Sequence, residues 1–173
     1  MDHYIPKRRI PVTLWVQSRE AVSAHLFLDI EGRPPGPTSL LYKLNESTPF
    51  LAAAVGAEGR IHLFNKSLVL RVTPGRGVLQ SDVFARGFDP WREEEATCLL
   101  ADGTELSGKV WMPLARESQR LSDYMNQIGD GFFVLLTAVG PHLLSPHGVT
   151  EIRLAESAGA PLDAVDLEDA SAA

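Results

Sequence analysis

The stretch ATCLLADGTELSGKVWM, residues 96–112, decides the fold class that the sequence predicts. Two segments rich in apolar, β-branched and aromatic residues, 96–101 and 105–112, flank the pair Asp102-Gly103. Such segments are typical of half-buried strands. An Asp-Gly pair between them is a strong hairpin signal, because a type I′ turn needs positive φ and glycine adopts it at little cost. The stretch therefore predicts two antiparallel strands joined by a tight turn.

A similar succession of residues occurs in the first half of the chain. Residues 12–16, VTLWV, align with 96–100, ATCLL, at an offset of 84, and the offset falls to 80 toward the end. The segments that match in pattern and order are 12–16 with 96–100, 23–28 with 107–112, 39–45 with 120–126, 49–51 with 131–133, 62–64 with 142–144, and 69–72 with 149–152. Self-similarity of this kind predicts an internal duplication.

Each unit is predicted to contain two strands, one short helix and then further strands. The expected strands are 11–17, 21–29, 49–55, 60–64 and 67–73 in the first unit, and 96–101, 105–112, 131–139, 141–144 and 149–154 in the second. We therefore expect a mainly β fold with short helices (α+β), formed by two tandem pseudo-repeats. Each repeat would be a small antiparallel sheet or partial barrel with one short helix.

The two expected helices carry residues typical of helix ends. Thr38 or Ser39 in the first unit and Ser118 in the second are candidate N-caps, because a hydroxyl accepts the unpaired N–H groups of a first turn. Asn45 and Asn126 are expected to end the helices, since asparagine tolerates the left-handed conformation common there.

The domain organisation follows from these elements. We predict an N-terminal extension at 1–10, a first β repeat at 11–73, a connector at 74–95, a second β repeat at 96–154, and an acidic, flexible tail at 155–173. The connector contains Val78, Leu79, Val83 and Phe84, which are expected either to add an edge strand or to pack against a neighbour. The tail has five acidic and no basic residues, which is typical of a solvated segment.

The composition of the 173 residues, 45% hydrophobic and 22% charged, is that of an ordinary globular protein. The longest apolar runs, such as FLAAAV at 50–55, are too short to span a bilayer, so no membrane insertion is expected. Cys98 is the only cysteine, which excludes an intrachain disulfide and a cysteine-based metal cluster. These features predict a cytoplasmic location.

The charge is unevenly distributed along the chain. Residues 1–80 contain ten Lys/Arg and six Asp/Glu, whereas residues 81–173 contain six and sixteen. The two halves are therefore expected to attract each other. The overall charge of −6 argues against a dedicated nucleic-acid binder, which usually has a basic excess.

Residues 96 to about 154 resemble a known type of small domain. The hairpin around Asp102-Gly103, followed by RLSDYMN at 120–126, is similar to a small bacterial domain of unknown function that has a DG hairpin and an RLSDYLN-type motif. That resemblance implies no activity. The hairpin also has a remote likeness to Sm-like and SH3-like barrels, which implies single-stranded RNA binding, although in Sm proteins the helix precedes the first strand.

The stretch QRLSDYMN at 119–126 contains the main candidate site. Arg120, Asp123 and Asn126 are expected either to form a recognition surface or to serve as helix caps and a surface ion pair. Arg120 and Asp123 have no charged counterpart in the first unit, where Ser39 and Tyr42 stand.

A second candidate site is the basic cluster Lys7, Arg8 and Arg9, which is suited to contacts with phosphates or with an acidic partner. Together with Arg33 and Arg71, the cluster would form the basic wall of a groove between the repeats. Such a groove would hold a small ligand or single-stranded RNA.

Other candidate chemistry finds little support in the sequence. His62 and His142 lack further ligands at metal-binding spacing, and Ser145-Pro146-His147 lacks the context of a nucleophile elbow. No catalytic residue, metal site or cofactor is predicted. The leading hypothesis is a non-enzymatic adaptor or regulatory module that binds a protein partner or self-associates. The alternative is a small-ligand or single-stranded RNA binding module of Sm-like type.

Overall fold

The structure is a computed structural model that describes residues 6–30, 37–84, 92–112 and 120–155. In this part of the chain the fold is mainly β, as expected, with ten antiparallel strands and three short α-helices. The strands are β1 (Lys7–Val16), β2 (Val22–Asp29), β3 (Phe50–Val55), β4 (Arg60–Asn65), β5 (Val69–Pro74), β6 (Arg92–Leu100), β7 (Glu105–Met112), β8 (Phe133–Thr137), β9 (Gly140–Leu144) and β10 (Val149–Leu154). The helices are α1 (Leu40–Leu44), α2 (Gln80–Val83) and α3 (Leu121–Ile128), with 3-10 turns η1 (Lys66–Leu68) and η2 (Pro146–Gly148).

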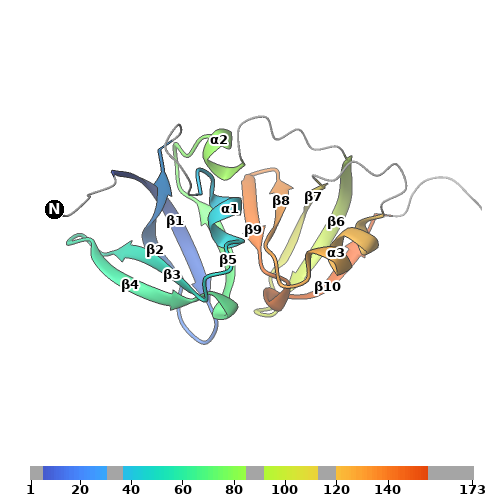
Figure 1. Ribbon diagram of the computed structural model, residues 1–173. Helices are drawn as coiled ribbons and strands as arrows, with labels where there is room; N and C mark the ends of the chain where they lie inside the picture. The colour runs from blue at the N-terminus through green and yellow to red at the C-terminus, as the bar shows by residue number, and fades with distance from the viewer. Residues whose placement is uncertain (1–5, 31–36, 85–91, 113–119, 156–173) are drawn as a thin grey trace, which may run out of the picture.

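All ten strands belong to one sheet. Their order is β10-β6-β7-β8-β9-β5-β1-β2-β3-β4, so the first five strands in sequence lie next to one another, as do the last five. The two groups meet where β5 pairs with β9, in the middle of the molecule in Figure 1. Strands β4 and β10 are the two ends of the sheet.

Alternating apolar residues give the strands their buried faces. On β1 the buried residues are Ile10, Val12 and Leu14, and the residues between them are more exposed. Strand β6 buries Ala96, Cys98 and Leu100 in the same alternation. Cys98 is fully buried, as expected for a small apolar residue.

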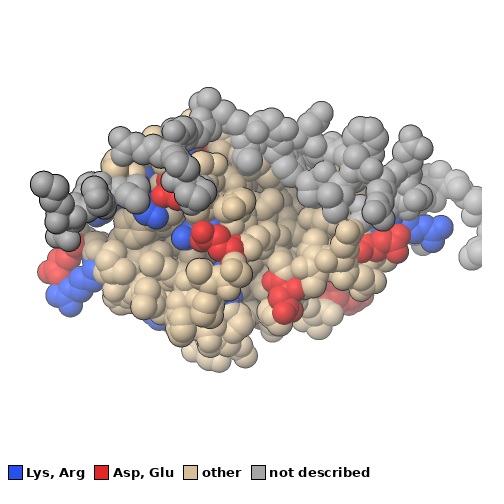
Figure 2. Space-filling model, in the orientation of Figure 1, with Lys and Arg blue, Asp and Glu red and all other residues tan. Residues whose placement is uncertain are grey.

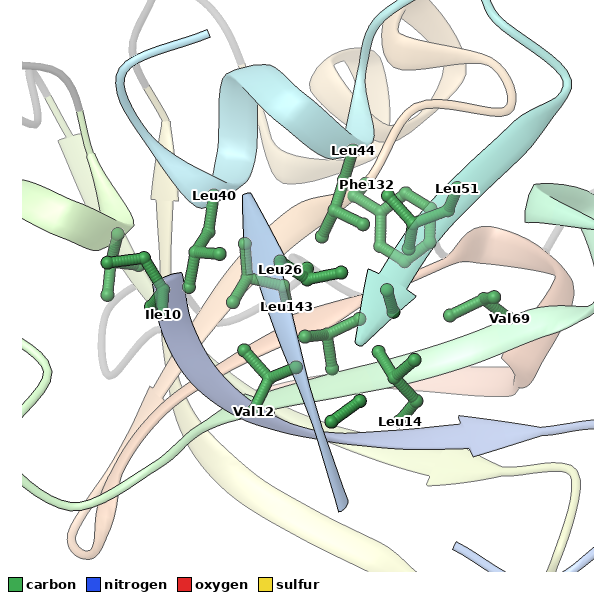
Figure 3. Close-up of a cluster of buried hydrophobic side chains, with 14 of the residues drawn as sticks. Ile10, Val12, Leu14, Leu26, Leu40, Leu44, Leu51, Val69, Phe132 and Leu143 are labelled. Carbon is green, nitrogen blue, oxygen red and sulfur yellow. The ribbon is translucent and has the colours of Figure 1, made fainter. Parts of the chain in front are cut away.

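The larger hydrophobic core extends across the junction between β5 and β9. Phe132, Val134 and Leu143 come from the second group of strands, yet they pack with residues of the first group such as Leu44 and Val72. Figure 3 shows Phe132 beside Leu44 and Leu51, and Leu143 beside Leu26. A second core, which includes Cys98, Leu121 and Tyr124, lies within the second group. The two groups therefore share the larger core, and the second group also has a core of its own.

The helix ends agree with the sequence in α1 and differ in α3. Ser39 caps α1, since its Oγ accepts a hydrogen bond from the N–H of Tyr42, and Asn45 follows the helix as expected. The expected end of α3 at Asn126 is wrong, because the helix continues to Ile128 and Gly129 is its C-cap. The candidate cap Ser118 lies outside the described residues.

The hairpin between β6 and β7 is confirmed, but its turn is not of type I′. Of the two residues, only Gly103 has a positive φ, 84°. The N–H of Leu100 bonds the carbonyl of Thr104, and the Asp102 carboxylate accepts the N–H of Thr104 at 2.9 Å. The connection is therefore a four-residue loop in which glycine alone takes the left-handed conformation.

Two boundaries also differ from expectation. Strand β1 begins at Lys7, so the basic cluster belongs to a strand and not to an extension. In the connector, α2 forms instead of an edge strand, and Val83 and Phe84 are buried in the larger core. The ring of Phe84 stacks on Trp111 with centroids 4.9 Å apart, which anchors the connector to the second group.

Candidate functional site

The predicted recognition residues Arg120, Asp123 and Asn126 lie on or beside α3. The Asp123 carboxylate accepts a hydrogen bond from the backbone N–H of Arg120 at 3.2 Å, which satisfies a free donor of the first turn. Arg120 borders a surface hollow with Arg92 and Glu94. Asn126 is exposed in the middle of α3, and its side-chain amide makes no hydrogen bond with the described residues.

Two of the three cations in the basic cluster are paired with carboxylates of the same chain. Lys7 pairs with Asp29 at 3.1 Å, and Arg8 pairs with Asp82 at 2.5 Å. The Arg9 guanidinium lies over the ring of Phe27, 5.8 Å from its centroid. The face of the molecule in Figure 2 likewise shows scattered blue and red groups and no continuous basic surface.

Arg71 is buried at the junction and does not line an open groove. Its guanidinium stacks on Trp15, 3.8 Å from the ring centroid, and its Nε has no hydrogen-bond partner in the described part of the chain. Burial lowers the pKa of Arg71, and nearby Asp102 partly offsets this effect. The adjoining cavity has a volume of about 20 Å³, which suffices for one water molecule. The predicted basic wall of a groove is therefore not formed by Arg71 together with Lys7, Arg8 and Arg9. Arg33 lies outside the described residues.

The two histidines that align in sequence occupy different environments. His62 is exposed on β4, whereas His142 is buried on β9 with its Nδ1 3.1 Å from the Thr73 hydroxyl. Burial lowers the pKa of His142, and the Arg71 charge lowers it further. No group of His, Cys, Asp and Glu side chains suited to a metal ion occurs among the described residues.

A surface hollow of about 690 Å³ lies over β6 and β7. A smaller one of about 460 Å³ lies over β1 and β2. In the larger hollow the Thr97 and Ser107 hydroxyls bond each other at 2.8 Å, and Lys109 pairs with Glu93 at 3.2 Å. These four polar groups are directed at one another, so among the described residues they form no set that converges on a ligand.

The most unusual surface is apolar and lies on the hairpin of β3 and β4. In its register Leu63 is opposite Ala52 and Ile61 is opposite Ala54, so these residues share one face with Phe50. Phe50, Ile61 and Leu63 are 53%, 58% and 66% exposed. We call Phe50, Ala52, Ile61 and Leu63 the β4 apolar face. Since β4 ends the sheet, its outer edge pairs with no strand in the described ranges.

The hairpin of β8 and β9, which the sequence alignment predicts to be equivalent, is covered. Phe132 is 4% and Leu143 0% exposed, because β5 and α1 of the first group pack against them. Asn45 bonds both backbone groups of Phe132, donating from Nδ2 to its carbonyl at 3.1 Å and accepting its N–H at Oδ1 at 2.7 Å. The β5–β9 junction thus shows how such a hairpin is covered: by a strand, a helix and an asparagine.

The sequence did not identify the β4 apolar face. The segment IHLF at 61–64 reads as an ordinary buried strand, and its match to HLL at 142–144 gave no reason to expect different exposure. The signal lies in the pairing of strands far apart in the chain, which no local pattern contains.

Comparison with protein-family models, with curated proteins and with solved structures finds no match to this chain. None of the helices in the described ranges is long and apolar enough to cross a membrane.

Proposed function

We propose that this chain is a non-enzymatic protein-interaction module, an adaptor or regulatory subunit, built from two copies of a small five-stranded β unit. The exposed edge of β4, with Ile61 and Leu63 beside it, carries the proposal. An edge strand offers unpaired N–H and C=O groups to another strand. An edge that is also apolar promotes aggregation unless a partner covers it, which supports a binding role.

Several paired features support the duplication. The sheet orders β5-β1-β2-β3-β4 and β10-β6-β7-β8-β9 are the same when the strands of each half are numbered from one. Asn65 and Ser145 each cap a 3-10 turn by accepting the N–H two residues later. Gln17 bonds the carbonyl of Leu68, just as Ala101 bonds that of Gly148. These contacts occur at positions that the aligned segments make equivalent.

Site-specific photo-crosslinking tests the interaction role. A photoreactive amino acid replaces Leu63, and the variant is expressed in the cells that naturally make the protein. We expect covalent adducts with protein, because position 63 lies on the surface proposed to be covered. Leu79 is the matched control, since it is 64% exposed but lies beside α2. Absence of adducts from position 63, or equal labelling from both positions, would contradict the proposal.

The alternative of single-stranded RNA binding has less support. Lys7 and Arg8 are already paired with Asp29 and Asp82, so few cations remain to displace counterions from phosphates. A titration with single-stranded oligonucleotides at low salt is expected to show no binding. Tight binding that weakens steeply with salt would favour the alternative.

A further inference from the structure

Strands β5 and β9 pair with each other, whereas the strands that align with them in the sequence, β10 and β4, stand at the two ends of the sheet. Strand β4 corresponds to β9, and β10 corresponds to β5, both at an offset of 80 residues. We propose that β4 of one copy of this chain pairs with β10 of a second copy, in the manner in which β9 pairs with β5. This inference rests on the proposed function and names its partner: another copy of the same chain.

We call the β5–β9 pairing the internal junction, and the proposed pairing of β4 with β10 of another copy the external junction. The internal junction predicts the register of the external one. Arg71 lies opposite Leu144, and Val72 lies opposite Leu143. Shifting each residue by 80 positions places Glu151 of one copy opposite Phe64 of the next, and Ile152 opposite Leu63. Strand addition at an open edge supplies backbone hydrogen bonds, and the opposed side chains supply specificity.

The exposure of matched residues supports this pairing. Phe132 and Leu143 are almost completely buried at the internal junction, whereas Phe50 and Leu63, their counterparts on the β4 apolar face, are more than half exposed. The internal face packs against Leu44 of α1 (Figure 3). Met125 of α3 occupies the matching position, and it is only partly buried at the free end of the second group.

The two asparagines that end the matched segments give a second, independent argument. Asn45 bonds the N–H and the C=O of Phe132 across the internal junction. Asn126 is its counterpart in SLLYKLN and RLSDYMN, is exposed, and has no side-chain hydrogen bond with the described residues. In the external junction Asn126 would bond the backbone of Phe50 in the next copy. A candidate recognition residue thereby acquires a specific role.

At one position the spacing of the strands in the external junction must differ from that in the internal junction. Gly148 packs closely on β5, and a Cβ there would lie 2.7 Å from the carbonyl oxygen of Leu70. Its counterpart is Leu68, which is 41% exposed. The external strands must therefore stand further apart at the η1 end. The pairing uses different surfaces on the two copies, so it is heterologous and continues into a ring or a filament.

Two single substitutions at exposed positions test the pairing in the full chain. Leu63→Arg places a charge on the β4 apolar face, and Asn126→Arg fills the place proposed for the Phe50 backbone. Leu79→Arg and Gln80→Arg are the matched controls, because both positions are exposed and lie at the start of α2, outside the proposed junction. Circular dichroism checks that each variant is folded, and sedimentation velocity measures its association.

We expect the unmodified chain to associate in a concentration-dependent manner. Leu63→Arg and Asn126→Arg should each weaken association by at least about thirty-fold, the effect of a central interface residue, and the controls should associate normally. An equimolar mixture of the two variants should form a species of two copies only. In that mixture Leu63→Arg still offers an intact β10, and Asn126→Arg still offers an intact β4.

Other results would overturn the inference. A chain that remains monomeric at every concentration excludes it. Assembly that Leu63→Arg abolishes but Asn126→Arg preserves would mean that β4 pairs with itself. The proposed function fails separately: a monomeric chain that still forms adducts with another protein from position 63 keeps the interaction role and loses the self-pairing.

Discussion

The side chain of Asn45 satisfies both backbone groups of Phe132, at 3.1 Å and 2.7 Å, across a sequence separation of 87 residues. An asparagine side chain carries an N–H donor and a carbonyl acceptor side by side, as a peptide group does, so it can bond the backbone as a neighbouring strand would. This contact holds the C-terminal end of α1 against the residue before β8, near the β5–β9 junction (Figure 1). Asn45 is exposed at the end of α1, yet it links the first group of strands to the second.

Replacing Asn45 by alanine is expected to lower the free energy of unfolding by about 1 to 3 kcal/mol, because two backbone groups lose their partner. Urea denaturation at low protein concentration measures this effect without a contribution from association. The control is Asn126→Ala, for which a change within about 0.5 kcal/mol is expected. Equal effects of the two substitutions would contradict the role assigned to Asn45.

Phe132 and Phe50 form a second matched pair. Phe132→Ala is expected to cost about 3 to 5 kcal/mol, because it opens a cavity where Leu44 and Leu51 now pack. Phe50→Ala should change stability by no more than about 0.5 kcal/mol, since its ring is largely exposed. Thermal or urea unfolding of both variants provides the measurement. A small loss for Phe132→Ala would mean that the shared core is loosely packed.

The same pair shows which features the sequence could predict. The alternation of Ile10, Val12 and Leu14 identifies a strand, and Ser39 identifies a helix start, because both signals lie within a few residues. Phe50 and Phe132 stand in similar local sequences, yet one is exposed and the other buried. Their burial depends on whether another strand occupies the adjacent edge, and this is a property of the assembled sheet.

The candidate sites illustrate the same limit. Arg8 reads as a free cation in the sequence, but the fold brings Asp82 to it from 74 residues away. Arg71 was expected on an open wall, whereas pairing of β5 with β9 buries it beside Trp15. Charged residues were therefore recognised correctly, but their partners depend on tertiary contacts.

The lowered pKa of His142 predicts a pH dependence of stability. Its folded-state pKa lies below the ordinary value of 6.5, so the unfolded chain binds the proton more readily. The stabilising effect is complete above the unfolded pKa and is lost as the pH falls from there through the folded pKa. Between about pH 7 and pH 5, the free energy of unfolding of His142→Gln should depend less on pH than that of the unmodified chain.

Urea unfolding of both proteins across this pH range measures the difference. His62→Gln is the control, because it removes an exposed histidine on β4 in place of the buried one. An unaltered slope for His142→Gln would show that other groups account for the pH response.

Burial raises the pKa of the Cys98 thiol from 9.0 to about 11. The thiolate is the reactive form, so near neutral pH its population falls by roughly one hundred-fold relative to an ordinary thiol. Because Cys98 is also fully buried, we expect alkylating reagents to modify it only as fast as the protein opens. Thiol titration with and without urea measures the ratio of the two rates. Rapid modification of the folded protein would show that β6 opens readily next to β10.

Gly148 provides a steric test of the contact between η2 and β5. A Cβ at this position would lie 2.7 Å from the Leu70 carbonyl oxygen and 2.8 Å from the Leu70 Cβ, closer than such atoms approach in proteins. Gly148→Ala should therefore displace η2 from β5 and lower the free energy of unfolding by about 1 to 3 kcal/mol. Leu68→Ala, at the exposed counterpart, should cost no more than about 0.5 kcal/mol. If urea denaturation gives equal stabilities, η2 does not pack on β5, and the β5–β9 junction is wider than its register implies.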